Sequence, residues 1–216
     1  QMKIFLDTAD TSIITKHFAT GLIDGITTNP TLIKKSGRDP LEVYQELKDL
    51  GIKDISMEVV GDADEMIKEG KGLYDTFGDC CTVKVPCSPD GLRACKELSD
   101  LNIRVNVTLI FSQVQAILAS KAGATYVSPF VGRVDDNSFG GICLVKDIVN
   151  VFKEHYTTTN VLAASIRNVR DVGRLFEHGA EIVTMPPAVF EKMYNHILTD
   201  KGLELFQADW ESVHNT

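Results

Sequence analysis

Eight short apolar runs recur at near-regular intervals along this chain of 216 residues. Most of them are continuous rather than alternating in hydrophobicity, which is expected of parallel strands that are covered on both faces. Few architectures bury eight such strands in a chain of this length, and a closed α/β barrel is one of them. The predicted strands span residues 3–7, 25–28, 55–60, 80–85, 104–108, 126–130, 161–165 and 182–185.

Segments with helical periodicity separate these runs. In Asp39-Pro40 and Ser88-Pro89 a capping side chain precedes a proline at the first helical position, where the missing N–H costs little. Eight strand–helix units with short connections predict a single (β/α)8 TIM barrel. No linker or low-complexity stretch divides the chain, so we expect one domain over residues 1–216.

A further helical pattern, at about residues 199–216, is additional to the eight units. Its apolar residues Leu203, Phe206 and Trp210 recur at the spacing of one helix face. We expect this C-terminal helical extension to pack outside the barrel or on another subunit.

The formal net charge of −8 argues against nucleic acid and anionic membrane as partners, because both are bound by clustered Lys and Arg. A few well-placed cations are still enough to hold one phosphate, so a small anionic substrate remains open. No apolar stretch is long enough to span a bilayer, and no charged-then-apolar leader opens the sequence. We therefore expect a cytoplasmic protein.

Five cysteines are present, an odd number that argues against a disulfide framework. Their spacing lacks the paired CxxC units of a zinc site. We therefore expect buried free thiols and no metal. The cysteines are Cys80, Cys81, Cys87, Cys95 and Cys143.

The most informative polar residue is Lys84, which lies inside the buried strand predicted at 80–85. Chemistry in such barrels takes place at the carboxyl ends of the strands. Burial of a lysine favours the neutral amine, which is a nucleophile toward carbonyl groups. A fixed ion pair of Lys84 with Asp7 or Glu58 explains its burial equally well, and its spacing alone leaves both interpretations open.

Asp7 and Glu58 lie on strands that a barrel can direct at the same centre as Lys84. Schiff-base chemistry needs repeated proton transfers, and a carboxylate in a partly dry site can serve for them. None of the five histidines falls at a strand end, so we expect all five at the surface. For Asp7, a turn-capping role before the first helix is the alternative.

Arg133, Ser165 and Arg167 follow the sixth and seventh strands and suit a phosphate site. Arginine offers a planar fork that matches phosphate oxygens, and a serine hydroxyl adds another donor. A surface salt bridge is the alternative for either arginine. No Walker-type or GxGxxG loop is present, so nucleotide binding has no support.

Asn29, Asn106 and Thr108 are neutral donors and acceptors at neighbouring strand ends, suited to sugar hydroxyls. Each alone has a structural alternative, the closing of a barrel loop. Composition and spacing together predict a barrel enzyme with a lysine nucleophile, two carboxylates and an anion site.

The residues named above lie in motifs that resemble those of the small transaldolases. The resemblance covers the chain from Met2 to about Trp210, and the motifs are long, ordered and specific in combination. They are Asp7-Thr8-Ala9, Gly25-Ile26-Thr27-Thr28-Asn29-Pro30-Thr31, Val83-Lys84-Val85-Pro86, Asn106-Val107-Thr108-Leu109-Ile110-Phe111-Ser112, Ser128-Pro129-Phe130-Val131-Gly132-Arg133 and Ala163-Ala164-Ser165-Ile166-Arg167.

The resemblance implies a role for each site residue. Lys84 is then the Schiff-base lysine, Glu58 and Asp7 are the acid–base carboxylates, and Thr108 helps to hold the catalytic water. The substrate-binding residues implied by the resemblance are Thr27, Asn29, Asn106, Ser128 and Phe130, with Arg133, Ser165 and Arg167 at the phosphate.

The resemblance also implies a (β/α)8 fold and a homo-oligomer, a decamer built from two pentamers, in which the C-terminal helix reaches a neighbouring subunit. The expected reaction converts sedoheptulose 7-phosphate and glyceraldehyde 3-phosphate into erythrose 4-phosphate and fructose 6-phosphate. No cofactor or metal is implied, because the protonated imine is itself the electron sink.

Two other functions compete with transfer. The fructose 6-phosphate aldolases share the lysine but release dihydroxyacetone, and they typically carry glutamine and tyrosine where Glu58 and Phe130 stand here. These two residues therefore favour the transferase. A non-catalytic phosphosugar-binding barrel is the third hypothesis.

Overall fold

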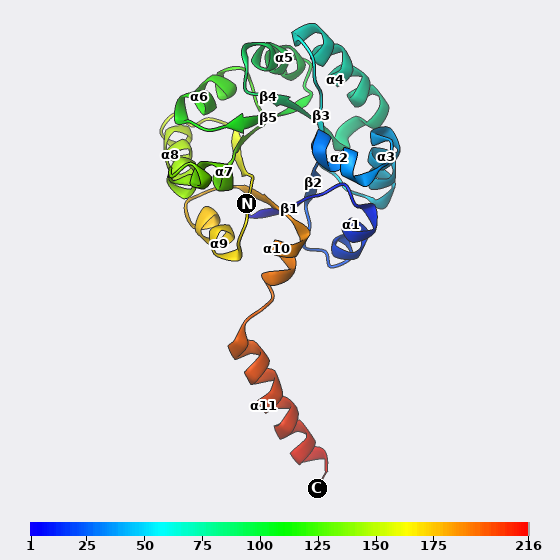
Figure 1. Ribbon diagram of the computed structural model, residues 1–216, viewed down its shortest axis with the longest axis vertical. Coiled ribbons are helices and arrows are strands. Elements are labelled where there is room, and N and C mark those ends of the chain that lie inside the picture. Colours follow the sequence, from blue (N-terminus) through cyan, green and yellow to red (C-terminus); the bar gives the residue numbers. More distant parts are fainter. Residues whose placement is uncertain (216) are drawn as a thin grey trace.

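The protein forms a closed barrel of eight parallel strands surrounded by helices, as the computed structural model shows for residues 1–215 (Figure 1). The predicted (β/α)8 barrel is confirmed, and Thr216, the last residue of the expected extension, lies outside the described residues. The strands are β1 (Lys3–Asp7), β2 (Gly25–Thr27), β3 (Ile55–Glu58), β4 (Cys81–Pro86), β5 (Arg104–Ile110), β6 (Tyr126–Pro129), β7 (Asn160–Ala163) and β8 (Ile182–Met185).

Helices follow the strands and form the outer ring. Most begin at a side-chain cap; Asp62, for example, opens α4 with a reciprocal capping box to Glu65. The barrel helices are α1 (Thr11–Phe18), α2 (Pro30–Ser36), α3 (Pro40–Leu50), α4 (Ala63–Phe77), α5 (Pro89–Asp100), α6 (Gln113–Lys121), α7 (Val131–Asp136), α8 (Gly141–Glu154), α9 (Val169–Glu177) and α10 (Pro187–Lys192).

Strand β7 ends two residues before the predicted end at Ser165. Ser165 has a φ of 59°, in the left-handed region, and a strand cannot continue through that conformation. Strand β6 likewise ends at Pro129, because Phe130 is the residue that precedes α7. Two predicted site residues therefore stand just beyond their strands, at the rim of the barrel.

Inside the barrel, an apolar layer separates the two ends. Phe5, Tyr126, Leu162 and Ile182 form this cluster, distinct from the larger core between strands and helices. Gly25 makes room for it, since a Cβ there would lie 2.6 Å from Cζ of Phe5. The layer fills the lumen, so polar side chains above it lie in a shallow basin rather than a pore.

A polar network closes the amino-terminal end of the barrel. Asp54 accepts hydrogen bonds from the hydroxyls of Thr82 at 2.7 Å and Tyr126 at 2.6 Å. Nε of Arg104 donates to the Thr82 hydroxyl at 2.9 Å. Because its buried polar atoms are paired with one another, this end of the barrel serves stability and leaves chemistry to the other end.

The expectation that all five histidines lie at the surface is wrong for His17. Its ring is buried on the inner face of α1, 3.0 Å from Oε1 of Glu191 and edge-on to Phe190 of α10. The five cysteines are free, and the burial expected for them holds for Cys80, Cys81 and Cys95, whereas Cys87 is half-buried and Cys143 is exposed.

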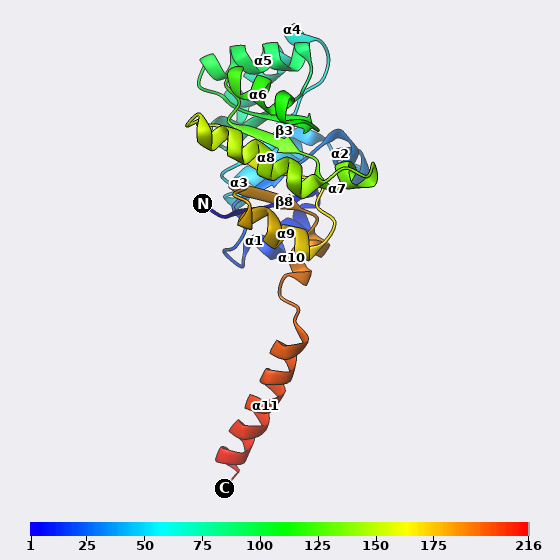
Figure 2. The same cartoon turned by 90° about the vertical axis from the view of Figure 1, so that its left-hand side faces the viewer.

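The C-terminal helix α11 (Ile197–His214) projects away from the barrel (Figures 1 and 2). None of its residues is buried, and Leu203, Phe206 and Trp210 expose 60%, 72% and 62% of their surfaces. We expected this extension to pack either on the outside of its own barrel or on another subunit, and it does not pack on its own barrel. Among residues 1–215, no helix has the length and apolarity needed to cross a bilayer.

Candidate active site

A cavity of about 140 Å³ lies above the apolar layer, at the carboxyl ends of the strands. In Figure 2 this end carries α2 and α7 and faces away from the N-terminus. Nine of the twelve predicted site residues line the cavity, and Glu58, Thr108 and Arg167 do not. The lining residues are Asp7, Thr27, Asn29, Lys84, Asn106, Ser128, Phe130, Arg133, Leu162, Ala164, Ser165 and Thr184.

Lys84 enters this cavity from β4 with only 6% of its surface exposed. Its Nζ donates to the carbonyl of Thr28 at 3.1 Å and lies 3.7 Å from Oε1 of Glu58. The second distance exceeds that of a good N–H···O hydrogen bond, and the described residues contain no ion pair of Lys84 with Asp7. Lys84 is therefore within ion-pair distance of Glu58 without a short hydrogen bond to it.

Two carboxyl groups flank Lys84. Glu58 is the Cα partner of Lys84 across β3 and β4, while Asp7 ends β1 on the far side of the cavity. Burial raises the pKa of both carboxyls, and the charge of Lys84 opposes the rise in each. A carboxyl whose pKa is raised toward neutrality both gives and takes protons more readily, which suits acid–base chemistry.

A chain of hydroxyls holds Asp7. The Thr27 hydroxyl donates to Oδ1 of Asp7 at 2.9 Å and lies 2.7 Å from the hydroxyl of Thr184. A hydroxyl has a single proton, so Thr184 must donate to Thr27 whenever Thr27 donates to Asp7. Thr27, which was predicted to bind substrate, lines the cavity and also donates to this carboxylate. Thr184 was not predicted, although it lies at a strand end.

A second chain fixes the amide of Asn106. Oδ1 of Asn106 accepts from the Ser128 hydroxyl at 2.7 Å, and Nδ2 donates to Oγ of Ser56 at 3.3 Å. Ser56 is fully buried and was missed in the sequence, because a serine in a strand is equally consistent with the core. The amide therefore presents a defined face to the cavity.

Asn29 divides its side chain between structure and cavity. Its Oδ1 accepts from the backbone N–H of Leu32 at 2.9 Å and so caps α2. Its amide N–H groups have no partner in the part of the chain that the structure describes. Asn29 therefore retains its amide donors, and the second lone pair of Oδ1, for a bound molecule.

Thr108 lies on β5 outside the cavity lining, with 2% of its surface exposed. Its hydroxyl is buried and has no hydrogen-bond partner within residues 1–215. Such orphan groups are rare, and each calls for an explanation such as a bound water.

Arg133 and Ser165 both line the cavity, at the end where the anion site was predicted. The Arg133 guanidinium lies 5.0 Å from the ring centroid of Phe130, which itself packs on Phe111 at 5.6 Å. Gly132 allows the close approach, since a Cβ there would lie 2.4 Å from the carbonyl oxygen of Ser165. The role of Gly132 was not predicted from the sequence.

Arg167 stands at the rim rather than in the cavity. It forms an ion pair with Asp136, and its hydrogen bond holds the pKa of that carboxyl below the usual range. This is the salt bridge weighed as the alternative for Arg167. Both side chains are about half exposed, and such surface pairs contribute little stability, so exchange for another anion costs little.

The fold and the cavity define the class of protein: a (β/α)8-barrel enzyme with a buried lysine, flanking carboxyls and an adjoining arginine and serine. The family model described as transaldolase/fructose-6-phosphate aldolase matches residues 4–216. The chain belongs to this family.

Curated relatives match over nearly their whole length. A protein of Cereibacter sphaeroides is 50% identical over 216 residues, covering 100% of this chain and 98% of the relative. A protein of Caulobacter vibrioides is 51% identical over 213 residues, covering 98% of each. A protein of Paracoccus denitrificans is 51% identical over 210 residues, covering 97% of this chain and 96% of the relative. All three are named "Probable transaldolase".

Replacement of Thr108 by valine is expected to separate stability from activity. The hydroxyl makes no hydrogen bond in the described protein, so its loss removes a desolvation penalty rather than a bond. The free energy of unfolding, measured by urea denaturation, should stay the same or rise. Sugar-phosphate turnover should fall roughly 10²-fold if the hydroxyl holds a catalytic water.

The matched control is Thr82→Val on the neighbouring strand. The Thr82 hydroxyl makes two hydrogen bonds, so its loss should cost about 1–3 kcal/mol of stability and leave turnover largely intact. Equal destabilisation by both variants, with full activity in Thr108→Val, would contradict the assignment.

Thr27→Val is expected to move the acid limb of the pH–activity profile to higher pH. The Thr27 hydroxyl lowers the pKa of Asp7 by donating to it, so its removal lets that pKa rise further. A larger fraction of Asp7 is then protonated at low pH, and a step that needs the carboxylate slows there. The pH dependence of kcat/KM measures the shift. Thr27→Ser keeps the hydroxyl and should restore the wild-type limb; an unshifted limb in Thr27→Val would show that Asp7 does not control it.

Proposed function

We propose that this protein is a transaldolase that transfers a dihydroxyacetone unit between sugar phosphates through a Schiff base on Lys84. The observation that carries the proposal is the buried Lys84 amine, which faces a cavity ending in Arg133 and Ser165. A ketose phosphate has a carbonyl group that the Lys84 amine can attack and a phosphate that Arg133 and Ser165 can bind. The name shared by the relatives supports the same activity.

The proposed reaction begins when the neutral amine of Lys84 attacks C2 of the ketose. Protonation of the resulting carbinolamine hydroxyl by Glu58, directly or through a water at Thr108, expels water and leaves a protonated imine. Loss of the C4 hydroxyl proton to Asp7 drives cleavage of the C3–C4 bond. The released electron pair enters the imine, and an aldehyde departs.

The bound three-carbon unit is then an enamine. Its C3 attacks the carbonyl carbon of the acceptor aldehyde, and the new alkoxide takes its proton back from Asp7. Hydrolysis of the imine returns Lys84 as the free amine. The protonated imine supplies the electron sink within the substrate, so the proposal needs no cofactor or metal.

The remaining cavity residues suit substrate binding. Asn106, Ser128 and Asn29 offer neutral donors and acceptors to sugar hydroxyls, and Arg133 with Ser165 offers charged and neutral donors to a phosphate. Arg167 reaches the same phosphate once it leaves Asp136.

Aldol cleavage with release of dihydroxyacetone is the second candidate. Glu58 and Phe130 both argue against aldol cleavage, since they differ from the glutamine and tyrosine typical of the aldolases. A phenolic hydroxyl near the enamine would help to protonate and release the three-carbon unit, and Phe130 has none. We therefore favour transfer to a second aldehyde.

We further propose that the protein is a homo-oligomer, a pentamer or decamer, and works in the cytoplasm. The apolar stripe Leu203–Phe206–Trp210 on α11 lacks cover from its own barrel and supports contact with a second copy. The five free thiols suit a reducing compartment.

The test of transfer is release of glyceraldehyde 3-phosphate from fructose 6-phosphate, with and without erythrose 4-phosphate. We expect release that depends on the acceptor, because the enamine has no phenolic donor to release it. A coupled dehydrogenase assay measures the product. Comparable release without an acceptor would assign the protein to the aldolases.

Borohydride trapping is the accompanying control. Mass added at Lys84 in the presence of ketose phosphate is expected, and it excludes a mere phosphosugar binder. Lys84→Met should abolish both labelling and turnover while the circular-dichroism spectrum stays unchanged. Substantial residual turnover in that variant would overturn the Schiff-base mechanism.

Phe206→Glu is expected to weaken subunit association. A charge in the middle of the apolar stripe must be desolvated when the stripe is covered, which is costly. Sedimentation velocity should show smaller species than wild type. Lys201→Gln, on another face of the same helix, is the control, and an unchanged mass in Phe206→Glu would remove the stripe from the interface.

A further inference from the structure

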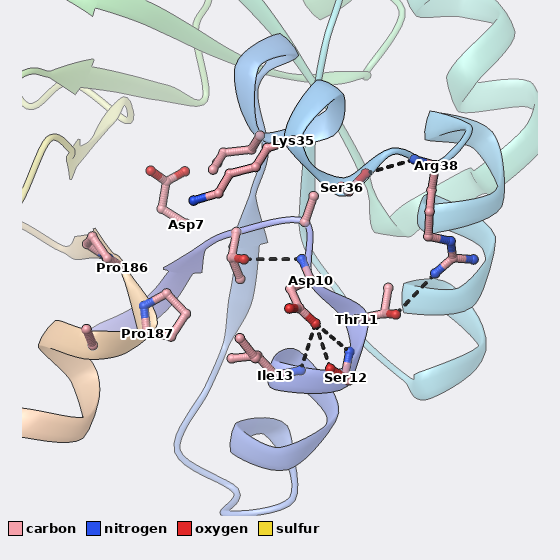
Figure 3. Close-up of a pocket in the computed structure, with 14 residues that line it drawn as sticks. Asp7, Asp10, Thr11, Ser12, Ile13, Lys35, Ser36, Arg38, Pro186 and Pro187 are labelled. Atoms are coloured by element: carbon pink, nitrogen blue, oxygen red, sulfur yellow. Dashed lines mark hydrogen bonds between the residues drawn. The ribbon is translucent and has the colours of Figure 1, made fainter.

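A second cavity, which we call the side chamber, adjoins the Lys84 cavity at Asp7. Its volume is about 680 Å³, and its walls come from the β1–α1 turn, α2 and the start of α10 (Figure 3). Asp7 is common to both cavities. A molecule bound at Lys84 and Asp7 therefore has open space beside it on this side.

The Lys84 cavity is small for its proposed substrates. Its 140 Å³ falls below the roughly 300–1,000 Å³ of ordinary small-molecule sites. The proposed reaction also uses acceptors that differ by one carbon, while the lysine and the anion end stay at a fixed separation. The additional carbon and hydroxyl of the longer chain must therefore bend aside, and the side chamber offers the room.

Most polar side chains of the chamber are already engaged. The Ser12 hydroxyl donates to Asp10 at 2.7 Å, and the Ser36 hydroxyl donates to the carbonyl of Ile33 at 2.6 Å. Arg38 donates to Glu46 at 2.6 Å and to Thr11 at 3.2 Å. These contacts fix the two serine hydroxyls and the Nη1 group of Arg38 in the walls of the chamber.

Lys35 differs from these neighbours. Its ammonium extends across the chamber toward Asp7 in Figure 3 and makes no hydrogen bond or ion pair within the described residues. An ammonium carries three donors, each able to bond a sugar hydroxyl. Lys34, one residue earlier on α2, lines a different groove and does not reach the chamber.

We propose that Lys35 is a specificity-determining residue that binds a hydroxyl of the longer acceptor in the side chamber. This inference rests on the proposed transfer reaction and adds to it a subsite for aldose phosphates of four carbons. A solvated surface lysine would instead affect acceptors of both lengths alike.

The test compares acceptors in the Lys35→Met variant, which keeps the stem of the side chain and removes the charge. We expect the ratio of kcat/KM for erythrose 4-phosphate to kcat/KM for glyceraldehyde 3-phosphate to fall roughly tenfold, the effect of losing one charged hydrogen bond. Lys34→Met is the matched control and should keep the wild-type ratio.

An unchanged ratio in Lys35→Met, or an equal loss for both acceptors, would overturn the inference. Failure of the proposed function has a different signature: wild-type enzyme would then show no borohydride labelling of Lys84 or no acceptor-dependent release. The two failures are thus read from different experiments.

Discussion

The register of the closed sheet is the constraint on which the site depends. Glu58, Lys84 and Asn106 are successive Cα partners across β3, β4 and β5, so strand pairing places them side by side on neighbouring strands. Phe5 and Tyr126, two residues before Asp7 and Ser128 on their strands, belong to the apolar cluster that fills the lumen beneath the polar side chains. The polar side chains thus lie directly above an apolar layer. The same arrangement buries Asp7 and Glu58, and this burial raises the pKa of both carboxyls.

The buried polar groups of the site are held in place by neighbours that satisfy part of their hydrogen-bonding capacity. Thr184 and Thr27 hold Asp7, Ser56 and Ser128 hold Asn106, and the carbonyl of Thr28 holds Lys84. What is left unsatisfied faces the cavity or, for Thr108, lies buried behind it. A protein that leaves polar groups unpaired gives up stability for function.

Features that depend on local pattern were predictable from the sequence. Continuous apolar runs and helix caps predicted the barrel. Lys84 was predicted as a site residue because a charged side chain inside a buried strand is costly unless it has a function or a partner. Features that depend on distant partners were not. The burial of His17 requires Glu191 and Phe190, 174 and 173 positions away, and the pairing of Arg167 requires Asp136. Hydroxyls such as Ser56 and Thr184 read as ordinary strand residues until the register brings them to their partners.

Gly132 limits how this cavity can vary. The carbonyl of Ser165 and the guanidinium of Arg167 crowd the position where its side chain would stand, so any larger residue displaces backbone. The part of the cavity beside Arg133 and Ser165 is therefore rigid, and substitution of Gly132 cannot reshape it in small steps. Beside Asp7, by contrast, side chains border open space, so substitutions there can change the room available to a bound molecule. The shape of the cavity is therefore fixed beside Gly132, and it can vary beside Asp7.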